Sequence, residues 1–276
     1  MPFNAALVGA RWGPIDWAVT PRRALAFRAV LAPDDAAGLD DAAGPLTALP
    51  MQVVSPEWVL ALMARDHPDQ TLSPDEQRRG VHAAQDTRFL GPIPAGEILS
   101  VSGELIGVRA SRAGAVATTR YETRGADGGL LAVSLSTSIM REVAVSGEDR
   151  PPPEEPAPCP PVMRPEMAVP IRTSRGFPHQ YSECAEIWNP IHTERQVALA
   201  AGLSDILIHG TALWALAGLA LTPRGGPLKR LSARFRSPAW AGEPIELWAG
   251  PPVEGRLPFQ LEAADGRLLA DGFVER

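Results

Sequence analysis

Residues 181–218 read YSECAEIWNPIHTERQVALAAGLSDILIHGTALWALAG. Two short motifs stand out within this stretch. Residues 189–192, NPIH, form a turn that presents an amide and an imidazole, and residues 209–210, HG, open a run of apolar residues. The run at 210–221 is apolar on every side, so it predicts a buried helix and not an amphipathic surface helix. The rest of the domain must therefore wrap around this helix.

The chain also contains an internal repeat. The pattern R-F-x-x-P-x-x-A-G-E occurs at 88–97 and again at 234–243, and the pattern D-G-x-L-L-A occurs at 127–132 and again at 265–270. Two matching blocks in the same order indicate two copies of one fold.

A proline-rich segment separates the two copies. Residues 146–165 read SGEDRPPPEEPAPCPPVMRP, a composition that favours an extended, semi-rigid spacer. We therefore predict an N-terminal domain at 1–145, a linker at 146–165 and a C-terminal domain at 166–276.

Each copy has the signals of an antiparallel sheet around one helix. The Asp-Gly turns at 127–128 and 265–266 lie between stretches that alternate apolar and polar residues, as in β-hairpins. The first copy offers a helix at 56–65, with Ser55 as its N-cap and Pro56 in its first turn. These elements predict an α+β fold in each copy.

Composition excludes several classes of function. The 276 residues carry a net charge of −6, which argues against binding nucleic acid by neutralising phosphates. The apolar run at 212–221 is far shorter than the ~20 residues that span a bilayer. The two cysteines provide neither a disulfide framework nor a metal-binding pair. The first residues, MPFNA, show no basic region followed by an apolar stretch, so we expect no secretory signal. We expect a cytoplasmic protein without a metal site.

The NPIH turn, the small residue Ala198 and the IHG sequence at 208–210 together resemble the hydratase motif of MaoC-like hot-dog proteins. That family includes (R)-specific enoyl-CoA hydratases and 3-hydroxyacyl-thioester dehydratases. The resemblance implies a double hot-dog fold, in which the first domain is a degenerate copy and the second carries the site. It also implies an acyl-CoA or other acyl thioester as the partner, no cofactor, and further association into a homodimer or larger assembly.

The resemblance assigns roles to particular residues. His192 is the expected acid/base, because an imidazole exchanges protons near neutral pH. Asn189 would orient water, and the N–H of Gly210 at the helix start would stabilise the thioester oxygen as it becomes negative. His209 and Ile187 complete the expected substrate-binding group.

One position departs from the family pattern. Ile187 stands where the family has its catalytic aspartate, and an isoleucine cannot activate water. Glu186 is adjacent and could supply the missing carboxylate. Hydration or dehydration of an acyl thioester is the leading hypothesis. A non-catalytic acyl-CoA-binding protein and a hot-dog thioesterase remain the alternatives, and the sequence selects neither the acyl chain nor its carrier.

Overall fold

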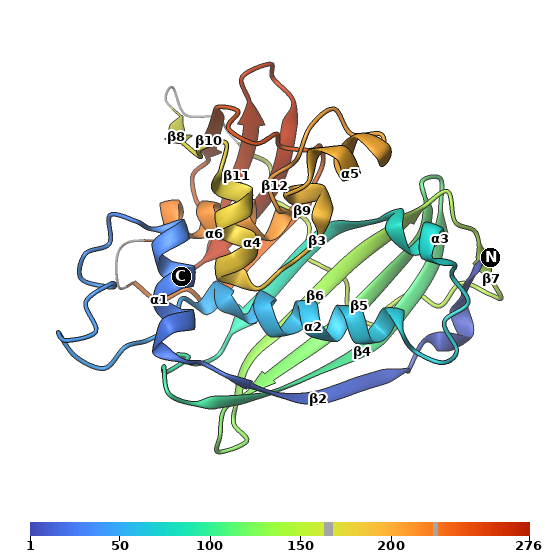
Figure 1. Cartoon of the computed structure of the whole chain (residues 1–276), viewed down its shortest axis with the longest axis horizontal. Helices are drawn as coiled ribbons and strands as arrows, with labels where there is room; N and C mark the ends of the chain where they lie inside the picture. The colour runs from blue at the N-terminus through green and yellow to red at the C-terminus, as the bar shows by residue number, and fades with distance from the viewer. Residues whose placement is uncertain (163–167, 223–225) are drawn as a thin grey trace.

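The computed structural model describes residues 1–162, 168–222 and 226–276. Ten strands form one antiparallel sheet in the order β2-β4-β5-β6-β3-β9-β12-β11-β10-β8, and the long helices lie across one of its faces (Figure 1). The strands are β2 (Arg11–Ala18), β3 (Gly80–Phe89), β4 (Ile98–Ser111), β5 (Gly114–Arg124), β6 (Leu130–Arg141), β8 (Val169–Ile171), β9 (Arg230–Phe235), β10 (Ile245–Ala249), β11 (Arg256–Ala263) and β12 (Leu268–Glu275). The short strands β1 (Phe3–Asn4) and β7 (Val145–Ser146) pair separately.

Six α-helices and three short 3-10 turns complete the described chain. The α-helices are α1 (Pro21–Leu31), α2 (Val54–Arg65), α3 (Pro74–Arg78), α4 (Phe177–Ala185), α5 (Arg195–Ala200) and α6 (Gly210–Leu221). The 3-10 turns are η1 (Ala5–Leu7), η2 (Pro50–Val53) and η3 (Pro190–His192). None of the described helices has the length and hydropathy that crossing a bilayer requires.

The sheet consists of two halves with the same strand connections. The first half has the order β2-β4-β5-β6-β3, and the second has the corresponding order β8-β10-β11-β12-β9. The two repeated blocks occupy equivalent places in the two halves. Each R-F pair ends a strand, β3 or β9, and each D-G turn joins the last two strands of its half along the chain, β5 to β6 or β11 to β12. Antiparallel pairing of β3 with β9 makes the two halves one sheet. The predicted α+β plan is confirmed.

The central helix of each half matches the prediction to different degrees. The bounds of α6 coincide with the predicted run at 210–221. Helix α2 begins at Val54, directly after η2, so Ser55 lies inside its first turn and not at its N-cap. The hydroxyl of Ser55 is buried without a partner among the described residues. The N-cap prediction was wrong because the preceding turn already supplies helical geometry.

The described part of the proline-rich segment is bound to the sheet. Arg150 exchanges two backbone hydrogen bonds with Val108 of β4, the N–H of Ala157 donates to Asp86 of β3, and Pro156 is buried. Residues 163–165 of the predicted linker lie outside the described residues. The described part therefore crosses the sheet from one half to the other instead of standing clear as a spacer.

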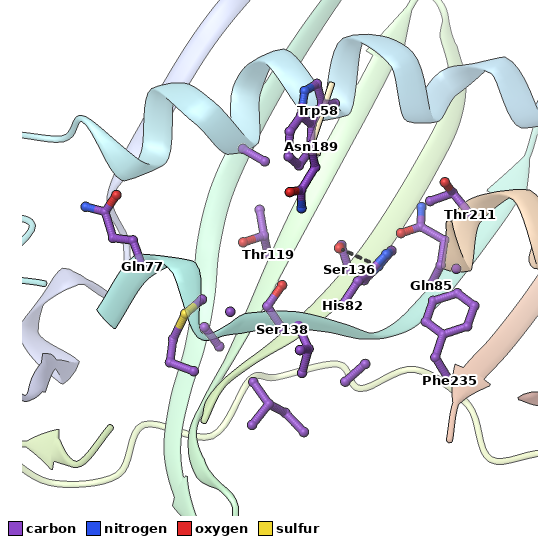
Figure 2. Close-up of a pocket in the computed structure, with 18 of the residues that line it drawn as sticks. Trp58, Gln77, His82, Gln85, Thr119, Ser136, Ser138, Asn189, Thr211 and Phe235 are labelled. Atoms are coloured by element: carbon purple, nitrogen blue, oxygen red, sulfur yellow. Dashed lines mark hydrogen bonds between the residues drawn. The ribbon is translucent and has the colours of Figure 1, made fainter. Parts of the chain in front are cut away.

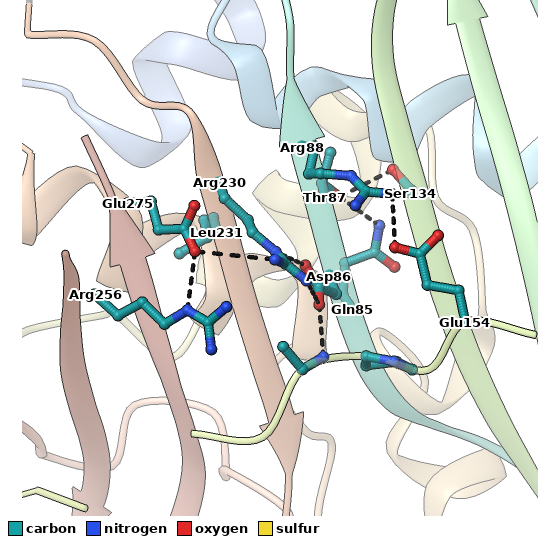
Figure 3. A network of polar contacts seen from close by, with 12 residues as sticks. Gln85, Asp86, Thr87, Arg88, Ser134, Glu154, Arg230, Leu231, Arg256 and Glu275 are labelled. Carbon is teal, nitrogen blue, oxygen red and sulfur yellow. Dashed lines mark hydrogen bonds and ion pairs between the residues drawn. The ribbon is translucent and has the colours of Figure 1, made fainter. Parts of the chain in front are cut away.

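A buried ion pair joins the two halves where β3 meets β9 (Figure 3). The Arg230 guanidinium donates to both carboxylate oxygens of Asp86, each at 2.8 Å. The second Asp86 oxygen also accepts the N–H of Ala157, at 2.8 Å. Both half-sheets and the linker segment therefore meet at one carboxylate.

Candidate active site

A cavity of about 590 Å³ lies between the two halves. Helix α2 and the inner face of β3, β5 and β6 line its first-half side, while η3 and the start of α6 line its second-half side. Five of the six predicted site residues border this one cavity: Ile187, Asn189, His192, His209 and Gly210.

His192 is buried and held in one tautomer. Its Nδ1–H donates to the carbonyl of Leu207 at 2.8 Å, which leaves Nε2 as the nitrogen with a free lone pair. Burial lowers the pKa of His192 to about 4, against the smaller opposing effect of the Leu207 carbonyl. The ring is therefore neutral near pH 7 and can accept a proton at Nε2.

His209 supports His192 by stacking. The ring centroids are 3.6 Å apart and the planes differ by 19°. The Nε2–H of His209 faces the carbonyl of Ile187 at 3.3 Å and the hydroxyl of Ser182 at 3.2 Å, while its buried Nδ1 finds no partner within the described part of the chain. Burial, and then the adjacent His192, hold the pKa of His209 well below its usual value. The pair therefore consists of two neutral rings.

Gly210 begins α6 and leaves backbone donors free. The N–H groups of Gly210 and Thr211 come before the first backbone hydrogen bond of the helix, which Ala212 donates to the His209 carbonyl at 3.0 Å. A Cβ on residue 210 would lie 3.1 Å from three atoms of the Phe235 ring. A side chain at this position would therefore crowd the Phe235 ring at the end of β9, and the helix start offers N–H groups with a positive dipole end.

Asn189 and Ile187 come from the segment between α4 and η3. Asn189 caps η3, its Oδ1 accepting a long hydrogen bond of 3.5 Å from the N–H of Ile191. Its side chain lines the cavity, as does that of Trp58 of α2 (Figure 2). Ile187 is buried and borders the same cavity, and its carbonyl oxygen lies 3.3 Å from His209 Nε2.

The structure does not bring Glu186 to this cavity. Glu186 ends α4 in a left-handed conformation, with φ of 56°. Its two carboxylate oxygens accept from the guanidinium of Arg23 on α1, at 2.7 and 3.0 Å. The proposed replacement of the aspartate by Glu186 therefore has no support in this geometry, because the carboxylate is committed to another element.

The sequence reasoning missed a carboxylate in the first half. Glu57 of α2 is buried, borders the cavity, and accepts hydrogen bonds from the Ser134 hydroxyl and from Gln85 Nε2, the latter at 3.0 Å. Burial raises the pKa of Glu57 to about 7, outweighing both hydrogen bonds. The sequence did contain a signal for this carboxylate. Glu57 lies three residues after Val54 and four before Ala61, a spacing that places all three on one face of a helix, and all three border the cavity.

Glu57 makes stability depend on pH. The unfolded chain loses this proton near the ordinary glutamate value of about 4.3, whereas the folded chain keeps it to about pH 7. The free energy of unfolding therefore falls by roughly 3 kcal/mol as pH rises through that window. In Glu57→Gln this part of the pH dependence should vanish in urea titrations between about pH 4 and pH 8. A stability difference between variant and parent that stays constant with pH would contradict it.

Comparisons with known proteins agree with this arrangement. No family model matches the chain. It is 30% identical over 215 residues to 3-hydroxyacyl-thioester dehydratase Y of Mycobacterium tuberculosis, covering 71% of this chain and 72% of that protein. The structure of a MaoC-like dehydratase from Phytophthora capsici superposes with a TM-score of 0.80 at 20% identity, covering 99% of this chain and 97% of the other.

A Mycobacterium tuberculosis protein described as a double hot-dog fold superposes with a TM-score of 0.63 at 15% identity, covering 97% of this chain and 95% of the other. At this identity the likeness concerns the fold alone. It agrees with the two equivalent half-sheets, so the predicted double hot-dog architecture is confirmed.

Proposed function

The chain belongs to the family of MaoC-like 3-hydroxyacyl-thioester dehydratases, and from this we propose that it interconverts a 2-enoyl thioester and a 3-hydroxyacyl thioester by adding or removing water. The observation that carries the proposal is the pairing of two groups at one cavity. A neutral His192 presents a free Nε2, and the start of α6 presents unbonded N–H groups.

The two groups divide the chemistry of hydration. The thioester carbonyl oxygen accepts from the N–H of Gly210, where the helix dipole favours negative charge. His192 Nε2 removes a proton from water as the water oxygen bonds to C3, and the electron pair of the C2–C3 double bond moves to the thioester oxygen. The imidazolium then returns that proton to C2. Dehydration is the same path in reverse.

Ile187 defines how this site differs from the family pattern. With isoleucine at the aspartate position and Glu186 paired to Arg23, His192 takes both proton transfers itself. Its apolar, buried setting favours the neutral base, and the stacked ring of His209 limits its rotation.

Turnover of a series of trans-2-enoyl-CoA thioesters tests the function. We expect loss of the enoyl-thioester absorbance with formation of the 3-hydroxyacyl-CoA, identified by mass spectrometry. Release of free CoA without hydration would replace the proposal with a thioesterase. Saturable binding of acyl-CoA without any turnover would replace it with a binding protein.

Restoring the carboxylate should accelerate the reaction. In Ile187→Asp, a carboxylate beside His192 would stabilise the imidazolium that forms in the transition state, and we expect kcat to rise about tenfold. Ile187→Asn is the matched control, since it adds a polar side chain of similar shape without the charge. Equal effects of the two substitutions on kcat would show that charge at this position is unimportant.

A further inference from the structure

Glu186 leaves α4 in a conformation that its residue type does not favour. Its φ of 56° lies in the left-handed region, which residues with a Cβ adopt only at a cost. The side chain is held by Arg23 of α1, whose Nε and Nη2 each donate to one Glu186 oxygen, at 2.7 and 3.0 Å. A bidentate pair of this kind fixes geometry more firmly than a single exposed ion pair. A residue of the first half therefore holds a turn of the second half.

Arg23 is itself fixed by its surroundings in the first half. Its Nη1–H donates to the carbonyl of Ala18, at the end of β2, at 2.8 Å, and its guanidinium lies 4.7 Å from the ring centroid of Trp17. The backbone carbonyl of Arg23 accepts from Gln52 Nε2 at 3.0 Å. The guanidinium is therefore oriented by the first half and presents its remaining N–H groups to Glu186.

The turn at Glu186 sets the direction of the next peptide group. The N–H groups of Glu186 and Ile187 both donate to the carbonyl of Ser182, the second at 3.0 Å, and so close the end of α4. The Ile187 carbonyl then lies 3.3 Å from Nε2 of His209, whose other neighbour is the Ser182 hydroxyl at 3.2 Å. A right-handed or extended φ at residue 186 would direct this carbonyl elsewhere. One of the two polar groups that face His209 Nε2 therefore depends on Glu186.

His209 carries this constraint to the proposed base. Its ring stacks on that of His192 with the centroids 3.6 Å apart. The contacts from Arg23 to His192 thus form one continuous series, through the Glu186 carboxylate, the Ile187 carbonyl and the His209 ring. A tilt of the His192 ring would move Nε2 away from the water that it must deprotonate, and such misplacement slows a reaction steeply.

Apolar contacts keep α1 and α4 together independently of the ion pair. The two helices lie side by side (Figure 1). Phe27 follows Arg23 by four residues and so shares its face of α1, and its ring centroid lies 5.9 Å from that of Tyr181 on α4. Phe27 and Tyr181 are both fully buried. Loss of the Arg23 guanidinium should therefore leave the packing of the two helices in place and release only the turn at Glu186.

We propose that Arg23 is a positioning residue for the acid/base of this site. By holding Glu186 in its left-handed conformation, it keeps the Ile187 carbonyl against His209 and so fixes the orientation of the His192 ring. The inference rests on the proposed function for the role of His192. It adds a residue of the first half to a site whose proposed catalytic groups all come from the second half.

Kinetics of Arg23→Gln test the inference. We expect kcat for enoyl-CoA hydration to fall at least about fivefold while KM changes less than about twofold, because the variant moves the base and not the bound thioester. Glu186→Ala, which leaves α1 untouched, should lower kcat as far. Arg28→Gln is the matched control, since Arg28 lies on the same helix but donates to Asp35 and to the carbonyl of Thr47, both in the first half. An equal fall of kcat in the control, or a change confined to KM, would overturn the inference.

Glycine at position 186 should make Arg23 unnecessary. Glycine takes a positive φ without the cost that a Cβ imposes. In the Arg23→Gln background, Glu186→Gly should therefore return kcat to within about twofold of the parent. Glu186→Ala in the same background removes the same carboxylate but keeps a Cβ, and its kcat should stay low. Equal kcat in the two double variants would show that the conformation of residue 186 does not link Arg23 to the base, and would reject the inference.

Imidazole NMR separates this inference from the proposed function. The chain has five histidines, so the ring signals of His192 and His209 can be assigned by substitution. Arg23→Gln should shift both sets of signals and leave those of His67, beyond the end of α2, unchanged. These shifts in a protein that hydrates nothing would reject the hydratase and retain the link from Arg23 to the two rings. Hydration by Arg23→Gln at the parental kcat, with unshifted signals, would retain the hydratase and reject the link.

Discussion

Replacing His192 with alanine is expected to lower kcat/KM for enoyl-CoA hydration by about two to four orders of magnitude. The variant removes the Nε2 that takes the proton from water, and no described carboxylate from the NPIH segment can replace it, since Glu186 is paired with Arg23. Steady-state rates with parent and variant measure the effect. A variant with more than about a tenth of the parental kcat/KM would exclude His192 as the acid/base.

The pH profile supplies a second readout of the same role. His192 must be neutral to act as the base, and its pKa lies near 4 because the ring is buried. The acidic limb of kcat/KM should therefore fall below about pH 5 and not near the ordinary histidine value of about 6.5. His179→Gln is the control for a histidine outside the cavity: His179 bonds to the carbonyl of Thr193, and the glutamine amide can keep that bond.

Replacing Asp86 with alanine is expected to lower the free energy of unfolding by about 2–3 kcal/mol, since it leaves the part-buried guanidinium of Arg230 with only the more distant carboxylate of Glu275, at 3.9 Å. Asp86 is 2% exposed, and its carboxylate also accepts the N–H of the linker residue Ala157. The variant loses the contact at which β3, β9 and the linker segment meet. Urea unfolding followed by circular dichroism measures the loss.

A nearby exposed pair provides the comparison. Arg88 and Glu154 lie 2.7 Å apart on the same face, but both are more than one-third exposed (Figure 3). Glu154→Ala should therefore lower the free energy of unfolding by less than about 1 kcal/mol. Equal losses of the free energy of unfolding in Asp86→Ala and Glu154→Ala would contradict the prediction. They would show that the burial of the Asp86–Arg230 pair does not help to join the two halves.

Local patterns were sufficient to predict the repeat and the buried helix. The R-F and D-G blocks recur in order because each copy needs the same turns between the same strands, and α6 is apolar all round because it is enclosed. The NPIH turn and the His209-Gly210 helix start could be placed at one site because they lie within a single segment of 22 residues, counting from 189 to 210.

The direction of Glu186 could not be predicted in this way. Glu186 is next to Ile187, which occupies the position of the family's aspartate, so its place in the sequence suggested that it could supply the missing carboxylate. The left-handed conformation that ends α4 instead turns its carboxylate to Arg23, a residue 163 positions away in the chain. Proximity in sequence does not determine side-chain direction where a helix ends.

The sequence by itself determined the architecture of two hot-dog copies and the His192, Asn189 and Gly210 group, because helix periodicity, turn residues and short motifs act over a few residues. Only the tertiary structure decided which groups share the cavity with them. Glu57, His82, Thr119 and Ser138 come from one helix and three strands of the other copy. Their meeting depends on strand register and on the packing of the two halves, which are long-range contacts that no local pattern encodes.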